Sequence, residues 1–120
     1  MAAPNLANIS TITAKVKAAQ LGTTVTTNIL ENTAGSGKVF KINTIIIPNV
    51  DGSNSATATV YYHDGTTRFG LINTVEVPAD STLVALDKNS VLYLEEGTRI
   101  EAGANASNDL DILISYEELS

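Results

Sequence analysis

The amino-acid sequence predicts a single all-β domain, a jelly-roll-like β-sandwich of about eight or nine strands with an extended N-terminal arm. Three observations lead to this fold class. The composition is rich in threonine, valine and isoleucine, which favour strands. Short apolar runs recur at intervals of roughly 8–12 residues, with turn-forming residues between them. No segment shows the apolar periodicity of about 3.6 residues that indicates a helix.

The first 22 residues differ in pattern from the rest of the chain. Within residues 8–22 the large apolar residues follow no single period, and they are Ile9, Ile12, Val16 and Leu21. The Thr, Ser and Ile residues among them favour extended structure. We therefore expect an extended arm over residues 1–22 and a sandwich domain over residues 23–120. Because so few apolar residues anchor it, the arm is expected to pack on another surface.

The strongest strand signal lies at residues 38–49. Its apolar residues first alternate and then become continuous at residues 45–47, which predicts that its second half is buried on both faces. Pro48 closes it, because proline cannot donate a hydrogen bond to a ladder. Asp64-Gly65 is a pair typical of a hairpin turn. The expected strands cover residues 23–32, 38–49, 56–63, 66–77, 81–87, 90–94, 98–104 and 109–118.

The charge of the chain is negative and unevenly distributed. The net charge of −6 argues against nucleic acid and anionic membrane as partners, since both require a basic surface. Residues 1–50 carry four lysines and one glutamate, a balance of +3, whereas residues 51–120 carry a balance of −9. One interpretation is that these charges only lie on solvated faces. The other is that the N-terminal segment docks onto an acidic surface, for example on a neighbouring copy of the protein.

Several classes of protein are disfavoured by what the sequence lacks. It has no cysteine, so disulfides, thiolate metal sites and a cysteine nucleophile are excluded. Its longest apolar run, at residues 45–47, is far shorter than the roughly 20 residues of a membrane span. The first ten residues lack the charged and apolar regions of a signal peptide. We therefore expect a soluble protein that is not exported.

The only histidine, His63, is the first candidate for catalysis. Together with Asp64 and a Ser or Thr from elsewhere in the chain, it could in principle form a hydrolytic triad. The sequence has no Gly-x-Ser-x-Gly motif, however, and Asp64 is expected in the hairpin turn. One histidine without any cysteine also cannot form a zinc cluster. We expect His63 to be a residue at the end of a strand.

The acidic residues offer weaker candidates. Residues 51–55 resemble a calcium loop, but Asp51 is the only carboxylate in residues 51–63, so a structural turn is expected. Asp109 and Asp111 would share one face of a strand, as a glycosidase pair could, yet the chain has no tryptophan to support a sugar. The sequence "GSGK" at residues 35–38 lacks the other elements of a phosphate-binding loop. No catalytic, cofactor or metal site is predicted, and the protein is not expected to be an enzyme.

Three stretches of the sequence together resemble a known family. They are "MAAPNL" at residues 1–6, "SGKVFKINTIIIPNVDGSNSATATVYYHDGTT" at 36–67 and "VEVPADSTLVALDKNSVLYLEEGTRIEAGANASNDLDILISYEE" at 75–118. The chain resembles small virion structural proteins of tailed bacteriophages, especially phages of cyanobacteria and other aquatic bacteria. The resemblance covers nearly the whole chain. Its pattern is shared by many β-sandwich phage components, so it does not separate head proteins from tail proteins.

The resemblance implies a non-enzymatic protein that is present in many copies in the virion and is assembled in the host cytoplasm. Our first choice is a capsid decoration, or cement, protein that binds the head lattice as a small homo-oligomer, for example a trimer. Its partners would be copies of itself and the major capsid protein, with no cofactor, nucleic acid or membrane. The alternatives are a neck or tail component (connector, fibre-attachment or baseplate protein) and a host-facing carbohydrate-binding module.

Six residues are predicted to make protein contacts. An extended arm can pair across subunits, because main-chain hydrogen bonds supply affinity without long helices. Within the arm, Ile9 and Ile12 are expected to be apolar anchors, and Lys15 and Lys17 to be charged contacts. Neighbouring residues of a strand point to opposite faces, so of the pair at residues 61–62 one tyrosine should enter the core and the other a contact surface. Tyr62 and His63 complete the predicted set.

Overall fold

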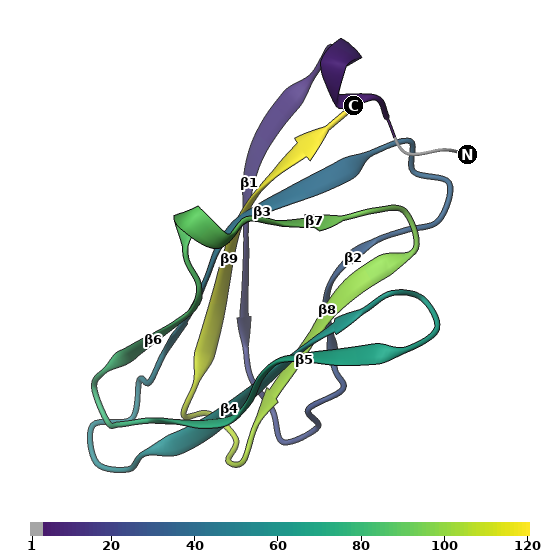
Figure 1. The fold of residues 1–120 in the computed structure, drawn as a ribbon. Coiled ribbons are helices and arrows are strands. Elements are labelled where there is room, and N and C mark those ends of the chain that lie inside the picture. Colours follow the sequence, from purple (N-terminus) through teal and green to yellow (C-terminus); the bar gives the residue numbers. More distant parts are fainter. Residues whose placement is uncertain (1–3) are drawn as a thin grey trace.

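In the computed structural model, which describes residues 4–120, two antiparallel β-sheets pack face to face (Figure 1). The strands are β1 (Ile12–Gln20), β2 (Asn28–Asn32), β3 (Val39–Pro48), β4 (Ala56–His63), β5 (Arg68–Val77), β6 (Thr82–Leu86), β7 (Leu92–Leu94), β8 (Thr98–Ala104) and β9 (Asp111–Leu119). A short 3₁₀ turn, η1 (Leu6–Asn8), precedes β1, and a second, η2 (Lys88–Ser90), lies between β6 and β7. Sheet A has the order β1-β9-β3-β6, with β7 also paired to β3, and sheet B has the order β2-β8-β4-β5.

The strand pairs are nested around the β4–β5 hairpin. β4 pairs with β5, β3 pairs with β6 and β7, β2 pairs with β8, and β1 pairs with β9. If β6 and β7 count as two parts of one strand position, this is the eight-position, two-sheet arrangement of a jelly roll. The predicted all-β sandwich of about nine strands is therefore confirmed.

Most strands lie where the sequence predicts them, and β4 and β8 match to the residue. The main difference is at residues 23–27, which we expected to begin a strand. There the hydroxyl and the backbone N–H of Thr27 both donate to the carbonyl of Thr24, at 2.7 and 3.2 Å. Threonine hydroxyls can satisfy backbone groups locally, so this segment turns instead of extending. As a result β2 begins only at Asn28.

The core lies between the two sheets and is almost entirely aliphatic. β3 and β9 supply its largest fully buried side chains from sheet A, and β4 and β8 supply those from sheet B. The prediction that residues 45–47 are buried on both faces is wrong. Ile45 and Ile47 are fully buried, but Ile46 points to the opposite, outer face and is partly exposed. No element of residues 4–120 covers this outer face of β3 as a third layer.

The N-terminal segment is extended, as expected, but it does not stand apart from the sandwich. β1 pairs with β9 over nine consecutive residues, from Ile12 opposite Leu119 to Gln20 opposite Asp111. Directly after it, Leu21 is buried in the core and donates its N–H to the carbonyl of Leu110 at 2.8 Å. The boundary that we expected at residue 22 therefore falls inside the folded sandwich. The first three residues of the expected arm lie outside the described residues.

Candidate functional site

The structure does not bring the six predicted contact residues together. Ile12, Lys15 and Lys17 lie on β1 in sheet A, and Ile9 follows η1 just before that strand. Tyr62 and His63 lie at the end of β4 in sheet B. Their surroundings also differ, since Tyr62 packs partly against the core while Ile12 is 63% exposed.

The loop residues that could have carried chemistry instead hold turns. Asp51 accepts hydrogen bonds from the N–H groups of Ser53 and Asn54 at 2.8 and 3.3 Å, and the pKa of Asp51 is lowered mainly by the bond from Ser53. Asp64 accepts the N–H groups of the next turn residues, Thr66 and Thr67, and its pKa is lowered for the same reason. These carboxylates are used as turn-stabilising acceptors.

His63 lies beside the second of these turns. Its Nδ1 accepts the N–H of Gly65 at 3.0 Å, so one ring nitrogen is engaged in the hairpin. Across residues 4–120, no three His, Cys, Asp or Glu side chains come close enough together to hold a metal ion. Asp109 lies near Asp51, and burial together with this negative neighbour raises the pKa of Asp109. Asp111, by contrast, opens β9 opposite Gln20.

The outer face of sheet B carries an ion cluster that the sequence did not reveal. Glu101 is 1% exposed and accepts hydrogen bonds from Nε of both Arg68 and Arg99. Burial alone would raise the pKa of Glu101, but the two guanidinium groups outweigh it and the pKa is lowered. The Arg68 guanidinium also lies 5.6 Å from the ring centroid of Tyr61, so it covers that aromatic ring. The buried carboxylate of Glu101 is therefore fully paired within the chain.

A loop of the same chain covers another part of this face. A Cβ at Gly103 of β8 would come within 2.5 Å of Cα of Val25 and 2.7 Å of the carbonyl oxygen of Thr24. The N–H groups of Ala102 and Ala104, on either side of Gly103, donate to the carbonyls of Thr27 and Gly22. The loop after β1 therefore lies directly on sheet B.

The outer face of sheet A is different, because apolar side chains cross it in a row. Ala18 lies opposite Leu113, Leu113 opposite Ile46, and Ile46 opposite Val84, so one residue comes from each of β1, β9, β3 and β6. Directly opposed residues of antiparallel strands share a face. Their sequence neighbours in β3 and β9 are buried, which places this row on the outside. We call these four residues the apolar row, and at its end Val84 is 55% exposed.

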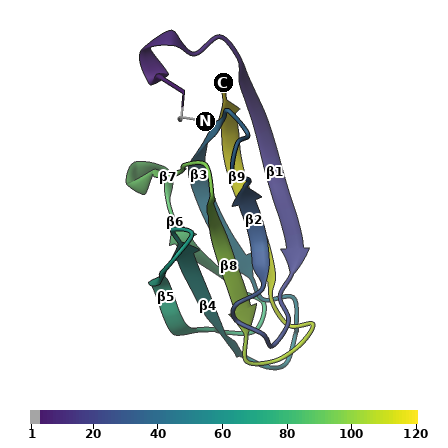
Figure 2. The same cartoon turned by 90° about the vertical axis from the view of Figure 1, so that its right-hand side faces the viewer.

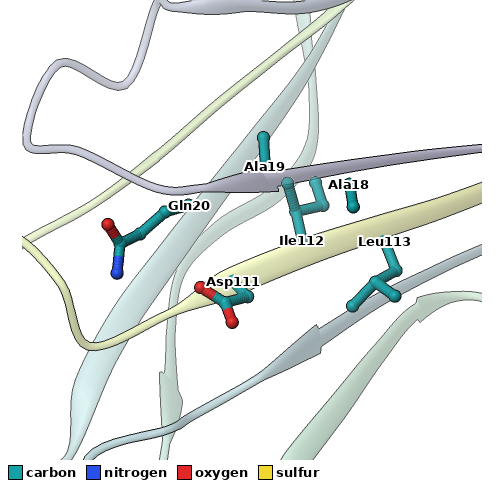
Figure 3. A pocket seen from close by; sticks show the side chains of 6 residues that line it. All are labelled: Ala18, Ala19, Gln20, Asp111, Ile112 and Leu113. Carbon is teal, nitrogen blue, oxygen red and sulfur yellow. The ribbon is translucent and has the colours of Figure 1, made fainter.

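A hollow of about 340 Å³ adjoins the apolar row where β1 meets β9 (Figure 3). Ala18 leaves room because its side chain is small, and Leu113 forms the apolar wall. Ala19 and Ile112 also line the hollow, but their side chains point toward the core. At the other end the polar groups of Gln20 and Asp111 lie side by side, as Figure 3 shows. The hollow therefore has the character of a contact surface with a single carboxylate at its rim.

The lysines of the N-terminal half do find an acidic surface, and it belongs to the same chain. Glu118 of β9 pairs with Lys15 at 3.4 Å and with Lys38 at 3.1 Å, and Lys41 lies 4.0 Å from Glu117. Burial would raise the pKa of Glu118, but Lys38 and Lys15 lower it overall. Three of the four lysines of residues 1–50 are thus paired where β1 and β3 flank β9.

The comparisons with known proteins do not identify the chain. No family model matches it, and no curated protein or solved structure is significantly similar to it. Among residues 4–120, no helix has the length and apolar character needed to cross a membrane. The candidate functional surface therefore rests on the geometry alone, and it consists of the apolar row, the hollow beside it and the edge strand β1.

Proposed function

We propose that this chain is a structural component of a phage virion, and specifically a capsid decoration protein that binds the head lattice through its surface. The apolar row on the outer face of sheet A carries this proposal. Antiparallel sandwiches usually alternate between apolar residues inside and polar residues outside. Here an outer face presents Leu113, Ile46 and Val84 together, beside a hollow lined by small side chains. A contact that covers this face would bury these aliphatic side chains. Each of them would contribute up to about 1.5–3 kcal/mol to the binding free energy.

Two further observations support a structural role. Jelly rolls are found in viral capsid proteins as well as in lectins and cupins, and among these the sequence resemblance favours the virion. The residues that seemed suited to chemistry, Asp51, His63 and Asp64, are engaged in turns. The arginine over the Tyr61 ring also leaves that aromatic less available as a platform for sugar, which disfavours the carbohydrate-binding alternative.

The proposal is tested by adding the purified protein to phage heads that lack it. The amount of bound protein is measured as a function of protein concentration until the heads are saturated. We expect Val84→Glu to weaken binding by at least tenfold, because it places a charge in the apolar row. Phe69→Glu is the matched control, since Phe69 is 53% exposed but lies on β5 of the other sheet. Equal loss of binding by both variants would contradict the assignment of sheet A, and no binding by the wild type would contradict the decoration role.

Copy number separates the proposal from its alternative, a neck or tail component with the same fold. A decoration protein should rival the major capsid protein in purified particles. A neck component should be present in about a dozen copies or fewer, as a connector ring would require. Quantitative mass spectrometry of the particles distinguishes these two outcomes, and absence of the chain would contradict both.

A further inference from the structure

The edge strand β1 differs from the other three edges of the two sheets. β2 and β6 are five residues long, and each has a register shift in its ladder. β5 has two register shifts, and its Thr74 adopts a positive φ of 52°. Bulges and short strands are devices by which proteins prevent edges from pairing. β1 has nine residues in one unshifted ladder, so its edge lacks these devices.

The free edge of β1 presents a regular set of backbone groups. Thr11 and Ser120 exchange both of their N–H···O bonds, each at 3.0 Å. Hydrogen-bonded pairs alternate along an antiparallel ladder, so odd-numbered residues of β1 bond to β9 and even-numbered ones point away. β1 is at the end of sheet A, and Figure 2 shows no other segment beyond it. The N–H and C=O groups of residues 12, 14, 16 and 18 are therefore available to a further strand.

The side chains of β1 restrict which strand can pair there. Ile12 and Val16 share the outer face and are 63% and 62% exposed. Lys15 and Lys17 share the other face, where Lys15 pairs with Glu118, and no ion pair of Lys17 occurs within residues 4–120. A suitable partner would cover the two aliphatic side chains and would not place a lysine opposite either lysine.

We propose that β1 pairs in antiparallel fashion with β1 of a second copy, about a two-fold axis at Ala14. In this register Ile12 of each copy lies opposite Val16 of the other copy. The two-fold axis therefore creates two such pairs, and in each pair the aliphatic side chains cover each other on the outer face. Lys15 and Lys17 then lie opposite Thr13 and Thr11. The two copies of sheet A become one continuous sheet.

Neighbouring registers are less favourable. A two-fold axis at Lys15 places the two copies of Lys15 opposite each other, and an axis at Val16 places Lys15 opposite Lys17 twice. Like charges directly opposed destabilise a strand pair. An axis at Thr13 avoids these contacts but separates Ile12 from Val16. Among the registers with the axis at residues 13–16, only the one at Ala14 both avoids the lysine pairs and places Ile12 opposite Val16.

The role of this contact in assembly rests on the proposed function. The contact itself can be tested on the isolated protein. It joins two copies, so a trimer would need a second surface. The chain has no cysteine, which makes single-cysteine variants unambiguous. In the proposed register the two Cα atoms at position 14 are about 5.5 Å apart, as a hydrogen-bonded pair requires, and a disulfide can bridge them.

We expect Ala14→Cys to form covalent dimers under mild oxidation. Ala18→Cys is the matched control, because this alanine is also exposed on the same face of β1 but lies about 27 Å from its copy, at roughly 3.4 Å per residue. The register would be overturned if Ala18→Cys formed covalent dimers. It would also be overturned if Lys15→Cys or Val16→Cys formed them more readily than Ala14→Cys.

A second variant tests the backbone bonds without disturbing the fold. Ala14→Pro removes an N–H that points away from β9, a position where an edge strand tolerates proline. We expect sedimentation to show the dimer dissociation constant raised at least tenfold, because two hydrogen bonds are lost per dimer. Ala14→Ser keeps the N–H and should remain dimeric.

Each outcome bears on one of the two proposals. A wild-type protein that stays monomeric at all concentrations, or an Ala14→Pro variant that folds and still dimerises fully, would overturn the strand pairing. A dimer that cross-links at Ala14 but does not bind heads would leave the strand pairing intact and contradict the decoration role.

Discussion

The outer faces of the two sheets contrast in what they leave exposed. On sheet B, Glu101 compensates two arginines, the loop after β1 lies on Gly103, and the border strand β5 is bulged. On sheet A, the apolar row crosses the outside and β1 offers a regular free edge. Sheet B thus pairs its buried charge within the chain, and its two edge strands are short or bulged. Sheet A leaves apolar side chains and a regular strand edge exposed, and this is why we propose that assembly uses sheet A.

The largest expected effect concerns the ion cluster of sheet B. Glu101→Gln should lower the free energy of unfolding by about 2–3 kcal/mol, because two arginines lose the buried carboxylate that compensates them. The measurement is urea denaturation at neutral pH. Glu31→Gln, on the same face but exposed, should change the stability by less than about 0.5 kcal/mol. Equal effects of the two variants would show that the cluster does not hold this face together.

The loop that covers sheet B can be tested at Gly103. Gly103→Ala should cost about 2 kcal/mol, because the added methyl group would meet the backbone of Val25 and Thr24. Gly22→Ala serves as the control, since its added methyl would meet nothing within 4 Å. Thermal unfolding of both variants checks this. If Gly103→Ala were as stable as the wild type, the loop could not lie against sheet B.

The attachment of β1 to the rest of sheet A should depend on pH. The lysines lower the folded-state pKa of Glu118 below its ordinary value of 4.5, so its carboxylate contributes stability above that pH. This contribution is lost as the pH falls from about 4.5 through the folded-state pKa. Glu118→Gln should therefore lose about 1 kcal/mol at neutral pH and little in acid.

Glu117→Gln is the matched control for Glu118, because its ion pair with Lys41 is longer, at 4.0 Å, and more exposed. It should change the stability by less than about 0.5 kcal/mol at any pH. The comparison is made by chemical denaturation at a series of pH values. An equal loss at neutral and acidic pH in Glu118→Gln would mean that the ion pairs do not fasten β1.

The smallest expected effect is at the apolar row itself. Val84→Thr should change the free energy of unfolding of the monomer by less than about 0.5 kcal/mol, because Val84 is already 55% exposed. Val60→Thr, at a fully buried position, should cost about 1–3 kcal/mol by burying a hydroxyl group. A large loss at Val84 would indicate that this face is covered within the single chain.

The sequence allowed the strands to be predicted well, because turn residues such as Asp64 and Gly65 punctuate it and the apolar residues between them alternate. It did not allow the strand partners to be predicted. The expected arm was extended, but nothing in residues 12–20 indicates that β9 is its neighbour. A threonine-rich stretch at 23–27 also looked like a strand, and only the local bonds to Thr24 show why it turns.

The candidate surface was harder to predict, for a related reason. The apolar row takes one residue from each of four strands that are distant in the sequence, so it becomes visible only when their registers are known. The apolar run at residues 45–47 contains one member of this row, Ile46, but by itself a continuous run predicts burial on both faces. The Glu101 cluster likewise joins Arg68 and Arg99 across two strands.

A reconstruction of the phage particle that locates this chain tests the central claim most directly. We expect many copies on the head, with the outer face of sheet A against the lattice or a neighbouring subunit and the outer face of sheet B toward solvent. Copies that expose Val84, Ile46 and Leu113 to solvent while sheet B makes the contacts would contradict the account.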